Sequence, residues 1–229
     1  MNASWVFFDI GSTLVDETDF NSHFLGYVYS TLEHAGVKVA KEAFDDCLKT
    51  VIAERKFDAG GYRTIIKALV KNFSNDTVII LDILDHYRDF DIKKYVESMT
   101  LFPDTIEVLN NLKGKYKLGI IANQPLSTRK RIETLGLTSY FDVIALSEEL
   151  QLRKPDIRIF LYALKTSGCN PKETVMIGDR LDADIGPAKS LGMTTIRIKK
   201  GIMNVQYPLN RHEIPDYEVE SLKQILSIL

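Results

Sequence analysis

Cysteine is nearly absent from this chain. Cys47 and Cys169 are the only two cysteines among 229 residues. Neither has the spacing of a CxxC motif or of a metal-binding pair, so a disulfide framework is not expected. A reducing compartment, and hence a cytoplasmic location, is the natural expectation for such a sequence.

Long hydrophobic runs and a strong excess of charge are missing as well. The longest apolar run, near Val78 to Leu84, is interrupted by Asp82, so no segment is expected to span a bilayer. The first four residues, Met1 to Ser4, carry no basic group, which does not fit a signal peptide. The formal net charge is −2, from 29 basic and 31 acidic residues. This balance suggests neither nucleic acid nor a membrane as a partner.

Short β-forming runs alternate with helical patterns over residues 1–15 and about 100–229. This alternation predicts an α/β fold with a parallel sheet and crossover helices. Strands are expected at Trp5–Phe8, Lys117–Ile121, Val143–Ala145, Val175–Ile177 and Thr194–Ile198. Helices are expected near Pro125–Leu135, Asp156–Thr166 and Ala183–Leu191. A glycine just past each helix is typical of a C-terminal cap: Gly136, Gly168 and Gly192.

The sequence from about Asp16 to Met99 has a different pattern. It separates the first two predicted strands by far more than one crossover requires. Apolar residues recur at helical spacing in four stretches, within about residues 20–35, 44–52, 62–73 and 78–87. We therefore expect a small helical bundle, a cap domain at 16–99, inserted into a core of 1–15 and 100–229. Gly60-Gly61-Tyr62 is a candidate loop facing the ligand site.

Charged and polar residues follow the predicted strands. Asp9 follows the first strand, Asn123 the second and Asp179 the fourth, while Lys154 precedes the helix after the third. Ligands of open α/β sheets bind beyond the carboxyl ends of the strands, so these side chains should meet in one crevice. Crowded carboxylates repel one another unless a cation joins them. Mg²⁺ favours a few carboxylates together with water and substrate phosphate.

These motifs resemble those of the haloacid dehalogenase (HAD) superfamily of hydrolases and phosphotransferases. Four segments carry the resemblance: Asp9-Ile10-Gly11-Ser12-Thr13, Ala122-Asn123-Gln124, Arg153-Lys154-Pro155, and Gly178-Asp179 through Asp182 and Asp184. They cover most of the core, and the insertion resembles the superfamily's α-helical cap. The resemblance implies a Rossmann-like parallel-sheet core and a Mg²⁺-dependent phosphatase of a small phosphorylated metabolite.

The resemblance also implies a nucleophile and a set of metal ligands. Asp9 corresponds to the nucleophile, which forms an aspartyl-phosphate intermediate. Asp9 and Asp179 correspond to direct Mg²⁺ ligands, and the residue at Gly11 supplies a backbone carbonyl to the metal. Asp184 corresponds to a further acidic group, often bound through water, with Asp182 as the alternative for that role.

Lys154 corresponds to the partner of the phosphate and the nucleophile, and Asn123 to a phosphate-binding amide and side chain. Two positions depart from the superfamily pattern. Gly11 stands where a second aspartate usually serves as general acid/base, and Ala122 lacks the usual hydroxyl for the phosphate. Turnover should suffer from the first change and phosphate binding from the second. A turn that needs a positive φ is an equally good explanation of Gly11.

Three other functions remain open at this point. Metal-free haloacid dehalogenases also lack the second aspartate of the first motif, but they usually lack an acid where Asp179 stands. Phosphonate hydrolases replace the same aspartate, keep Mg²⁺ and use a cap lysine as a Schiff base, for which Lys49 and Lys56 are available. A degenerate member would bind metal and a phosphorylated ligand without turnover.

Overall fold

The computed structural model describes residues 3–57, 62–88 and 92–229, so Gly60 and Gly61 of the candidate loop lie outside the described residues. The chain divides into two compact units. One contains Met1–Asp16 and Met99–Leu229, and the other contains Glu17–Ser98. Each unit has its own kind of secondary structure.

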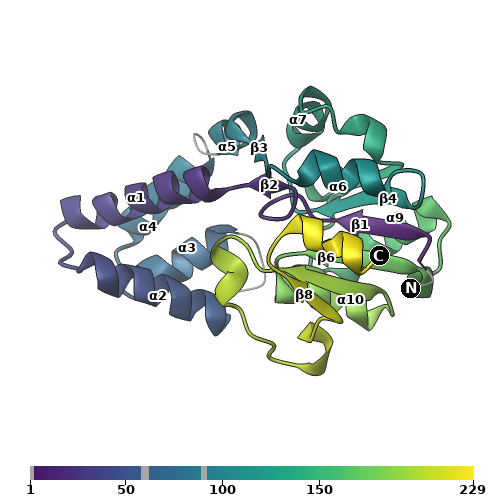
Figure 1. Cartoon of the computed structure of the whole chain (residues 1–229). Coiled ribbons are helices and arrows are strands. Elements are labelled where there is room, and N and C mark those ends of the chain that lie inside the picture. Colours follow the sequence, from purple (N-terminus) through teal and green to yellow (C-terminus); the bar gives the residue numbers. More distant parts are fainter. Residues whose placement is uncertain (1–2, 58–61, 89–91) are drawn as a thin grey trace. The chain divides into compact units, whose positions relative to one another are not determined.

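A six-stranded parallel sheet forms the centre of the first unit (Figure 1). Its strands are β1 (Trp5–Phe8), β4 (Lys117–Ala122), β5 (Val143–Leu146), β6 (Thr174–Gly178), β7 (Thr194–Ile198) and β8 (Tyr217–Val219). The strand order is β5-β4-β1-β6-β7-β8, with β1 paired to both β4 and β6. The connections run to opposite sides of β1, which makes the carboxyl end of β1 a switch point of the sheet. The predicted α/β fold is thus confirmed, and β8 is an addition to it.

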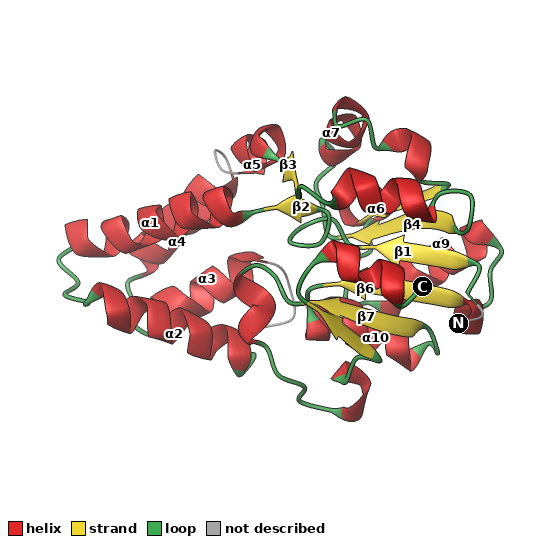
Figure 2. Cartoon of the chain, in the orientation of Figure 1, coloured by secondary structure: helices red, strands yellow, loops and turns green. Residues whose placement is uncertain are grey.

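Helices cover both faces of this sheet (Figure 2). The helices are α6 (Thr105–Leu112), α7 (Thr128–Thr134), α8 (Ser147–Leu150), α9 (Ile157–Ser167) and α10 (Gly186–Ser190). Helix α9 packs against β4 and β5, and α10 packs against β7. Gly136, Gly168 and Gly192 have φ values of 71°, 66° and 87°, which confirms their expected place at helix ends. The helix expected at Ala183–Leu191 is instead a π-helical turn, Leu181–Ile185, followed by α10.

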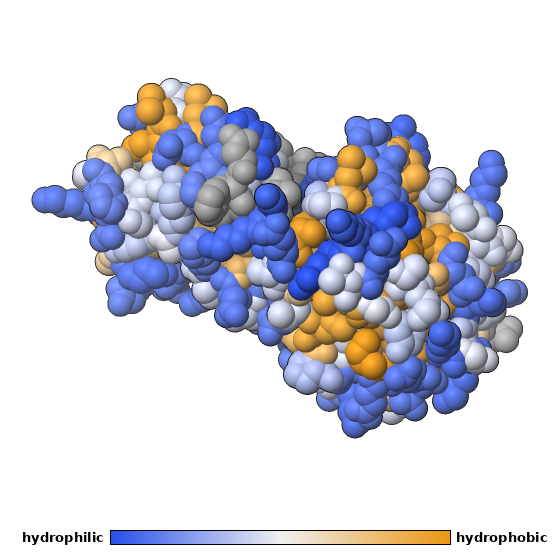
Figure 3. Space-filling model, turned by 90° about the horizontal axis from the view of Figure 1, so that it is seen from above, coloured by the Kyte–Doolittle hydropathy of each residue, from blue (hydrophilic) through white to orange (hydrophobic). Residues whose placement is uncertain are grey.

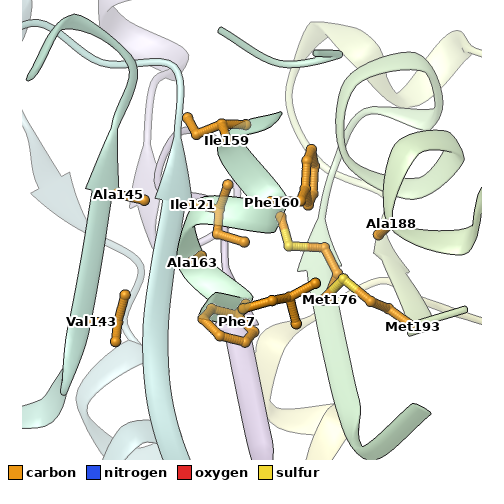
Figure 4. Close-up of a cluster of buried hydrophobic side chains, with 11 residues drawn as sticks. Phe7, Ile121, Val143, Ala145, Ile159, Phe160, Ala163, Met176, Ala188 and Met193 are labelled. Atoms are coloured by element: carbon orange, nitrogen blue, oxygen red, sulfur yellow. The ribbon is translucent and has the colours of Figure 1, made fainter. Parts of the chain in front are cut away.

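One buried cluster joins the sheet to α9 and α10 (Figure 4). Phe7 of β1 belongs to this cluster and is fully buried. An ideal Cβ on Gly119 of β4 would stand 2.5 Å from the ring of Phe7, so β4 needs a glycine beside that ring. Close packing of this kind fixes the central strands, which carry the polar groups at their carboxyl ends.

The second unit is helical. Its described helices are α1 (Thr18–His34), α2 (Lys41–Ala53), α3 (Tyr62–Lys71), α4 (Thr77–His86) and α5 (Ile92–Ser98). The sequence pattern predicted four helices, so α5 corrects that number. Apolar residues at helical spacing form the interior, and Phe24, Phe44, Ile65 and Ile83 are fully buried. Burial of one face of each helix is what apolar residues at helical spacing predict for a helical bundle.

A two-stranded antiparallel pair lies where the chain leaves and re-enters the first unit. It consists of β2 (Val15–Asp16) and β3 (Thr100–Leu101). The backbone N–H of Phe102 and the hydroxyl of Thr105 both donate to the carbonyl of Leu14, the latter at 2.8 Å. These bonds attach both crossings to the sheet unit. The sequence did not predict this pair, because each strand has only two residues.

The surface shown in Figure 3 is a mixture of hydrophilic residues and smaller hydrophobic patches. Exposed apolar side chains include Val78 and Leu81 on α4 and Ile157 and Leu161 on α9. None of the helices in the described ranges is long and apolar enough to cross a bilayer.

Candidate active site

Two neighbouring strands place two aspartates side by side. Strand β1 ends at Phe8 and strand β6 at Gly178, and Phe8 pairs with Ile177 in the parallel register. Asp9 and Asp179 are the next residues, and the backbone N–H of Asp9 donates to the carbonyl of Ile177 at 2.9 Å. Asp9 is 9% exposed and Asp179 is 4% exposed. The carboxylates predicted to share a crevice are therefore neighbours, and both are buried.

A third aspartate completes a buried acidic cluster. Three carboxylate oxygens, one from each of Asp9, Asp179 and Asp184, lie within 4.8 Å of one another. Asp184 comes from the π-helical turn after β6, and its Oδ2 accepts a hydrogen bond from the backbone N–H of Arg180 at 3.0 Å. We call Asp9, Asp179 and Asp184 the acidic cluster below.

Asp182 has different partners. The guanidinium of Arg180 donates to both of its oxygens, at 3.1 and 2.6 Å, and the side-chain amide of Gln206 donates to Oδ1 at 3.0 Å. Of the two acids considered for the metal, the structure thus brings Asp184 rather than Asp182 to the acidic cluster.

Lys154 lies against the acidic cluster and is 2% exposed. Its Nζ donates to Oδ1 of Asp9 at 2.6 Å and to Oδ1 of Asp184 at 2.5 Å. A third hydrogen bond, at 2.9 Å, goes to the backbone carbonyl of Ile121 at the end of β4. These contacts use the three donors of the ammonium group. The predicted meeting of Lys154 with the aspartates is therefore present in the structure.

Burial and neighbouring charges act against each other at this site. Burial raises the pKa of Asp184 to about 6, although the charge of Lys154 acts in the opposite direction. Burial acts to lower the pKa of Lys154, but Asp184 and Asp9 outweigh it and hold that pKa above its usual value. Three buried carboxylates lie close together beside the ammonium group of Lys154, and buried carboxylates held in this way are costly unless cations join them.

A divalent cation fits this donor set. Hard oxygen ligands are those that Mg²⁺ prefers, and a divalent cation would join carboxylates that otherwise repel one another. Both oxygens of Asp184 already accept hydrogen bonds, from Lys154 and from Arg180. Asp184 is therefore better suited to contact a metal through water than directly.

Asn123 follows the last residue of β4 and contacts Lys154. Its Oδ1 accepts a hydrogen bond from the backbone N–H of Lys154 at 2.8 Å, and its Nδ2 donates to the carbonyl of Lys154 at 2.9 Å. The resemblance implies a phosphate-binding amide and side chain here, whereas no pattern in the sequence signals this pair of bonds. Ala122 is buried. The nearby hydroxyl of Ser147 is hydrogen-bonded to the backbone of Gln124, so it does not replace the hydroxyl that Ala122 lacks.

Gly11 lies in the turn after Asp9 and is buried. The residue with a left-handed backbone in this turn is Ser12, with φ of 52°, and Gly11 is not among the glycines of positive φ. The explanation of Gly11 by a turn of positive φ is therefore wrong. What distinguishes Gly11 is the missing carboxylate.

The lysines considered for a Schiff base are exposed and paired with acids. Lys49 donates to Oδ1 of Asp46 at 2.9 Å, and this hydrogen bond raises the pKa of Lys49. Lys56 pairs with Glu54 at 2.6 Å. A Schiff-base lysine needs a lowered pKa. The surroundings of these two lysines therefore do not favour phosphonate hydrolysis.

Comparison with known proteins agrees with this geometry. The family model for haloacid dehalogenase-like hydrolases matches residues 6–198. The glyceraldehyde 3-phosphate phosphatase of Methanocaldococcus jannaschii is 30% identical over 98% of this chain and 96% of its own. The pyrimidine 5′-nucleotidase YjjG of Escherichia coli is 29% identical over 85% of each chain.

Solved structures are similar over almost the whole chain. A HAD phosphatase from Thermococcus onnurineus has a TM-score of 0.64 and 30% identity, over 100% of this chain and 97% of that one. The HAD-hydrolase YfnB from Bacillus subtilis, bound to magnesium, has the same fold, with a TM-score of 0.71 and 22% identity over 99% and 98% of the two chains. From its motifs, its sheet and these relatives, the chain belongs to the haloacid dehalogenase-like hydrolase family.

Proposed function

We propose that this hydrolase is a Mg²⁺-dependent phosphatase of small phosphorylated metabolites, with Asp9 as its nucleophile. The observation that carries the proposal is the buried contact of Lys154 with Asp9 and Asp184, beside Asp179. A buried carboxylate held by an ammonium group at a strand end is the arrangement that attack on a phosphoryl group needs. The names of the relatives, which act on phosphorylated small molecules, support the same substrate class.

In this proposal Asp9, Asp179 and the carbonyl of Gly11 hold Mg²⁺, and Asp184 contacts it through water. When bound, the ion supplies positive charge to the phosphoryl group and to the carboxylates around it. Lys154 supplies further positive charge at Oδ1 of Asp9. The protein thereby neutralises the dianionic phosphate that it has to approach with an anionic nucleophile.

The reaction takes place in two steps at Asp9. Lys154 contacts Asp9 through Oδ1, so Oδ2 is the oxygen proposed to attack phosphorus. The bond from Oδ2 to phosphorus forms as the bond to the leaving oxygen breaks, which gives an aspartyl-phosphate and an alcohol. Water then attacks phosphorus, inorganic phosphate leaves and the carboxylate of Asp9 is restored.

Gly11 makes this a slow or selective phosphatase. General acid/base catalysis typically contributes about 10²–10⁴ in rate. Without a carboxylate at position 11, the leaving oxygen takes its proton from water, and water must attack the aspartyl-phosphate without a base. Substrates with acidic leaving groups should therefore suffer least in the first step, whereas the second step is slow for all of them.

A substrate screen tests the proposal. Phosphate release from sugar phosphates, triose phosphates and pyrimidine nucleotides is measured with and without Mg²⁺, for the natural protein and for Asp9→Asn. We expect release that needs both Mg²⁺ and Asp9. Release that survives in Asp9→Asn would overturn the assignment of the nucleophile.

Two further measurements distinguish the alternatives. Titration calorimetry with Mg²⁺ should show binding that Asp179→Asn weakens strongly, and unchanged affinity would contradict the ligand assignment. Halide release from a 2-haloacid without metal would identify a dehalogenase. Binding of Mg²⁺ and inorganic phosphate with no release from any substrate would identify a member without turnover.

A further inference from the structure

Asn123 makes two hydrogen bonds to the backbone of one residue, Lys154. The amide N–H of Lys154 donates to Oδ1 and the carbonyl of Lys154 accepts from Nδ2, at 2.8 and 2.9 Å. The two bonds close a ring between the side chain and the peptide groups of Lys154. Asn123 and Lys154 are 31 residues apart, so this is a tertiary contact.

The backbone of Lys154 needs such a partner. Lys154 is 2% exposed and lies between α8 and α9, outside any helix or strand. A buried N–H and a buried carbonyl cost free energy when they are left without hydrogen bonds. Pro155 follows and has no N–H to offer. Asn123 satisfies both groups of Lys154 with one side chain.

Both ends of Lys154 are thereby attached to the end of β4. Nζ donates to the carbonyl of Ile121, and the backbone is held two residues later by Asn123. A lysine side chain has several rotatable bonds, so its ammonium group is well placed only when its backbone is fixed. With the backbone fixed at the strand end, Nζ can contact Asp9 and Asp184 at the same time.

We propose that Asn123 is a positioning residue, whose side chain acts by holding the backbone of Lys154 and not by binding the phosphate. The inference rests on the proposed role of Lys154 in phosphoryl transfer. It assigns the Asn123 side chain a task different from phosphate binding. A small misplacement of a catalytic group can cost about 10²-fold in rate, so losing this contact should lower kcat.

Kinetics of Asn123→Ala give the first test. We expect kcat to fall about 10- to 100-fold while KM changes by less than about threefold, because the ammonium is misplaced and the phosphate contacts remain. A KM that rises about tenfold or more with kcat unchanged would overturn the proposal, since that is the signature of a lost binding contact.

Ser147→Ala is the matched control. The hydroxyl of Ser147 accepts from the N–H of Gln124 at 3.1 Å and donates to its carbonyl at 3.3 Å. It therefore holds the same loop, one residue further on, and neither of these hydrogen bonds involves Lys154. This variant should keep kcat within about threefold of the natural protein. An equal loss in both variants would mean that loosening the loop is sufficient, and would contradict the specific role of Asn123.

A double-mutant cycle with Lys154→Met separates the two roles further. If Asn123 acts through Lys154, then Asn123→Ala costs at most about twofold in a protein that already lacks the ammonium. If Asn123 binds phosphate directly, the two losses multiply.

Hydrogen exchange tests the same contact without activity. The amide proton of Lys154, followed by NMR, should exchange at least about tenfold faster in Asn123→Ala than in the natural protein. Its exchange rate should be unchanged in Ser147→Ala. This result is independent of the substrate screen, so it stands even if the proposed phosphatase activity fails. Unchanged exchange in Asn123→Ala would overturn the proposal.

Discussion

The side chain of Asp184 lies directly over the backbone of Gly178. An ideal Cβ on Gly178 would stand 2.6 Å from the Cβ of Asp184 and closer still to its carboxylate carbon. Atoms of two side chains cannot occupy these positions together. Strand β6 must therefore end in glycine for Asp184 to reach the acidic cluster, which is the physical reason for Gly178 in this motif.

Gly178→Ala should weaken Mg²⁺ binding. The added methyl group displaces Asp184, and with it the acceptor of a hydrogen bond from Lys154. Changes to groups that support a metal site typically cost 10- to 100-fold in metal affinity, so we expect a loss of about that size. Titration calorimetry of both proteins with Mg²⁺ measures it.

Gly26→Ala is the control for that substitution. Gly26 lies inside α1, where an added Cβ meets nothing within 4 Å. It should raise the free energy of unfolding by about 1 kcal/mol, because alanine is the better helix former, and leave Mg²⁺ affinity unchanged. Equal Mg²⁺ affinities for Gly178→Ala and the natural protein would contradict the role assigned to Asp184.

Gly11→Asp should raise the turnover of alkyl phosphates. The new carboxyl group would give its proton to a poor leaving group, and the resulting carboxylate would act as a base for the attacking water. General acid/base catalysis of this kind contributes about 10²–10⁴ in rate. Turnover of an aryl and of an alkyl phosphate is compared for both proteins, after circular dichroism has established that each is folded. The alkyl substrate should gain more than the aryl one.

The opposite pattern would refute this explanation of Gly11. If the natural protein cleaves alkyl phosphates as fast as aryl ones, and Gly11→Asp lowers both rates, another group supplies the proton.

Stability at low pH should depend on Asp216. Burial acts to raise its pKa, but hydrogen bonds from Lys189 and Thr195 outweigh this and hold the pKa of Asp216 below its usual value. The folded state therefore binds this proton less readily than the unfolded state. The stabilisation is complete above the unfolded pKa, about 3.9, and is lost as pH falls through the pKa of the folded state.

Denaturant titrations between about pH 6 and pH 2.5 measure this effect. The free energy of unfolding should fall less steeply with decreasing pH in Asp216→Asn than in the natural protein. Identical slopes in the two proteins would show that Asp216 does not contribute.

The strands of the centre of the sheet were predictable, because their apolar runs are continuous. Strand β8 was not, since it has three residues and only Val219 among them is buried. Helix α5 was missed for a related reason, because Ile92–Ser98 is short and carries few apolar residues. Short elements of this kind are fixed by tertiary contacts, which local pattern does not record.

The acidic cluster was predictable from strand ends, but its details were not. Asp182 and Asp184 both fit the spacing of the motif. In the π-helical turn that contains them, Asp182 is hydrogen-bonded to Arg180, whereas Asp184 lies in the acidic cluster. The contact of Asn123 with Lys154 joins residues from two loops. The local sequence of neither loop predicts a contact with the other loop.

Trapping the phosphoryl group on the protein tests the central claim most directly. The natural protein is mixed with Mg²⁺ and an aryl phosphate, quenched in acid within one turnover and digested, and its peptides are examined by mass spectrometry. We predict a phosphoryl group on Asp9, which accumulates because the missing carboxylate at Gly11 slows the second step, and which is absent from Asp9→Asn. Phosphate release with no label on Asp9, or with the label on another residue, would contradict the account.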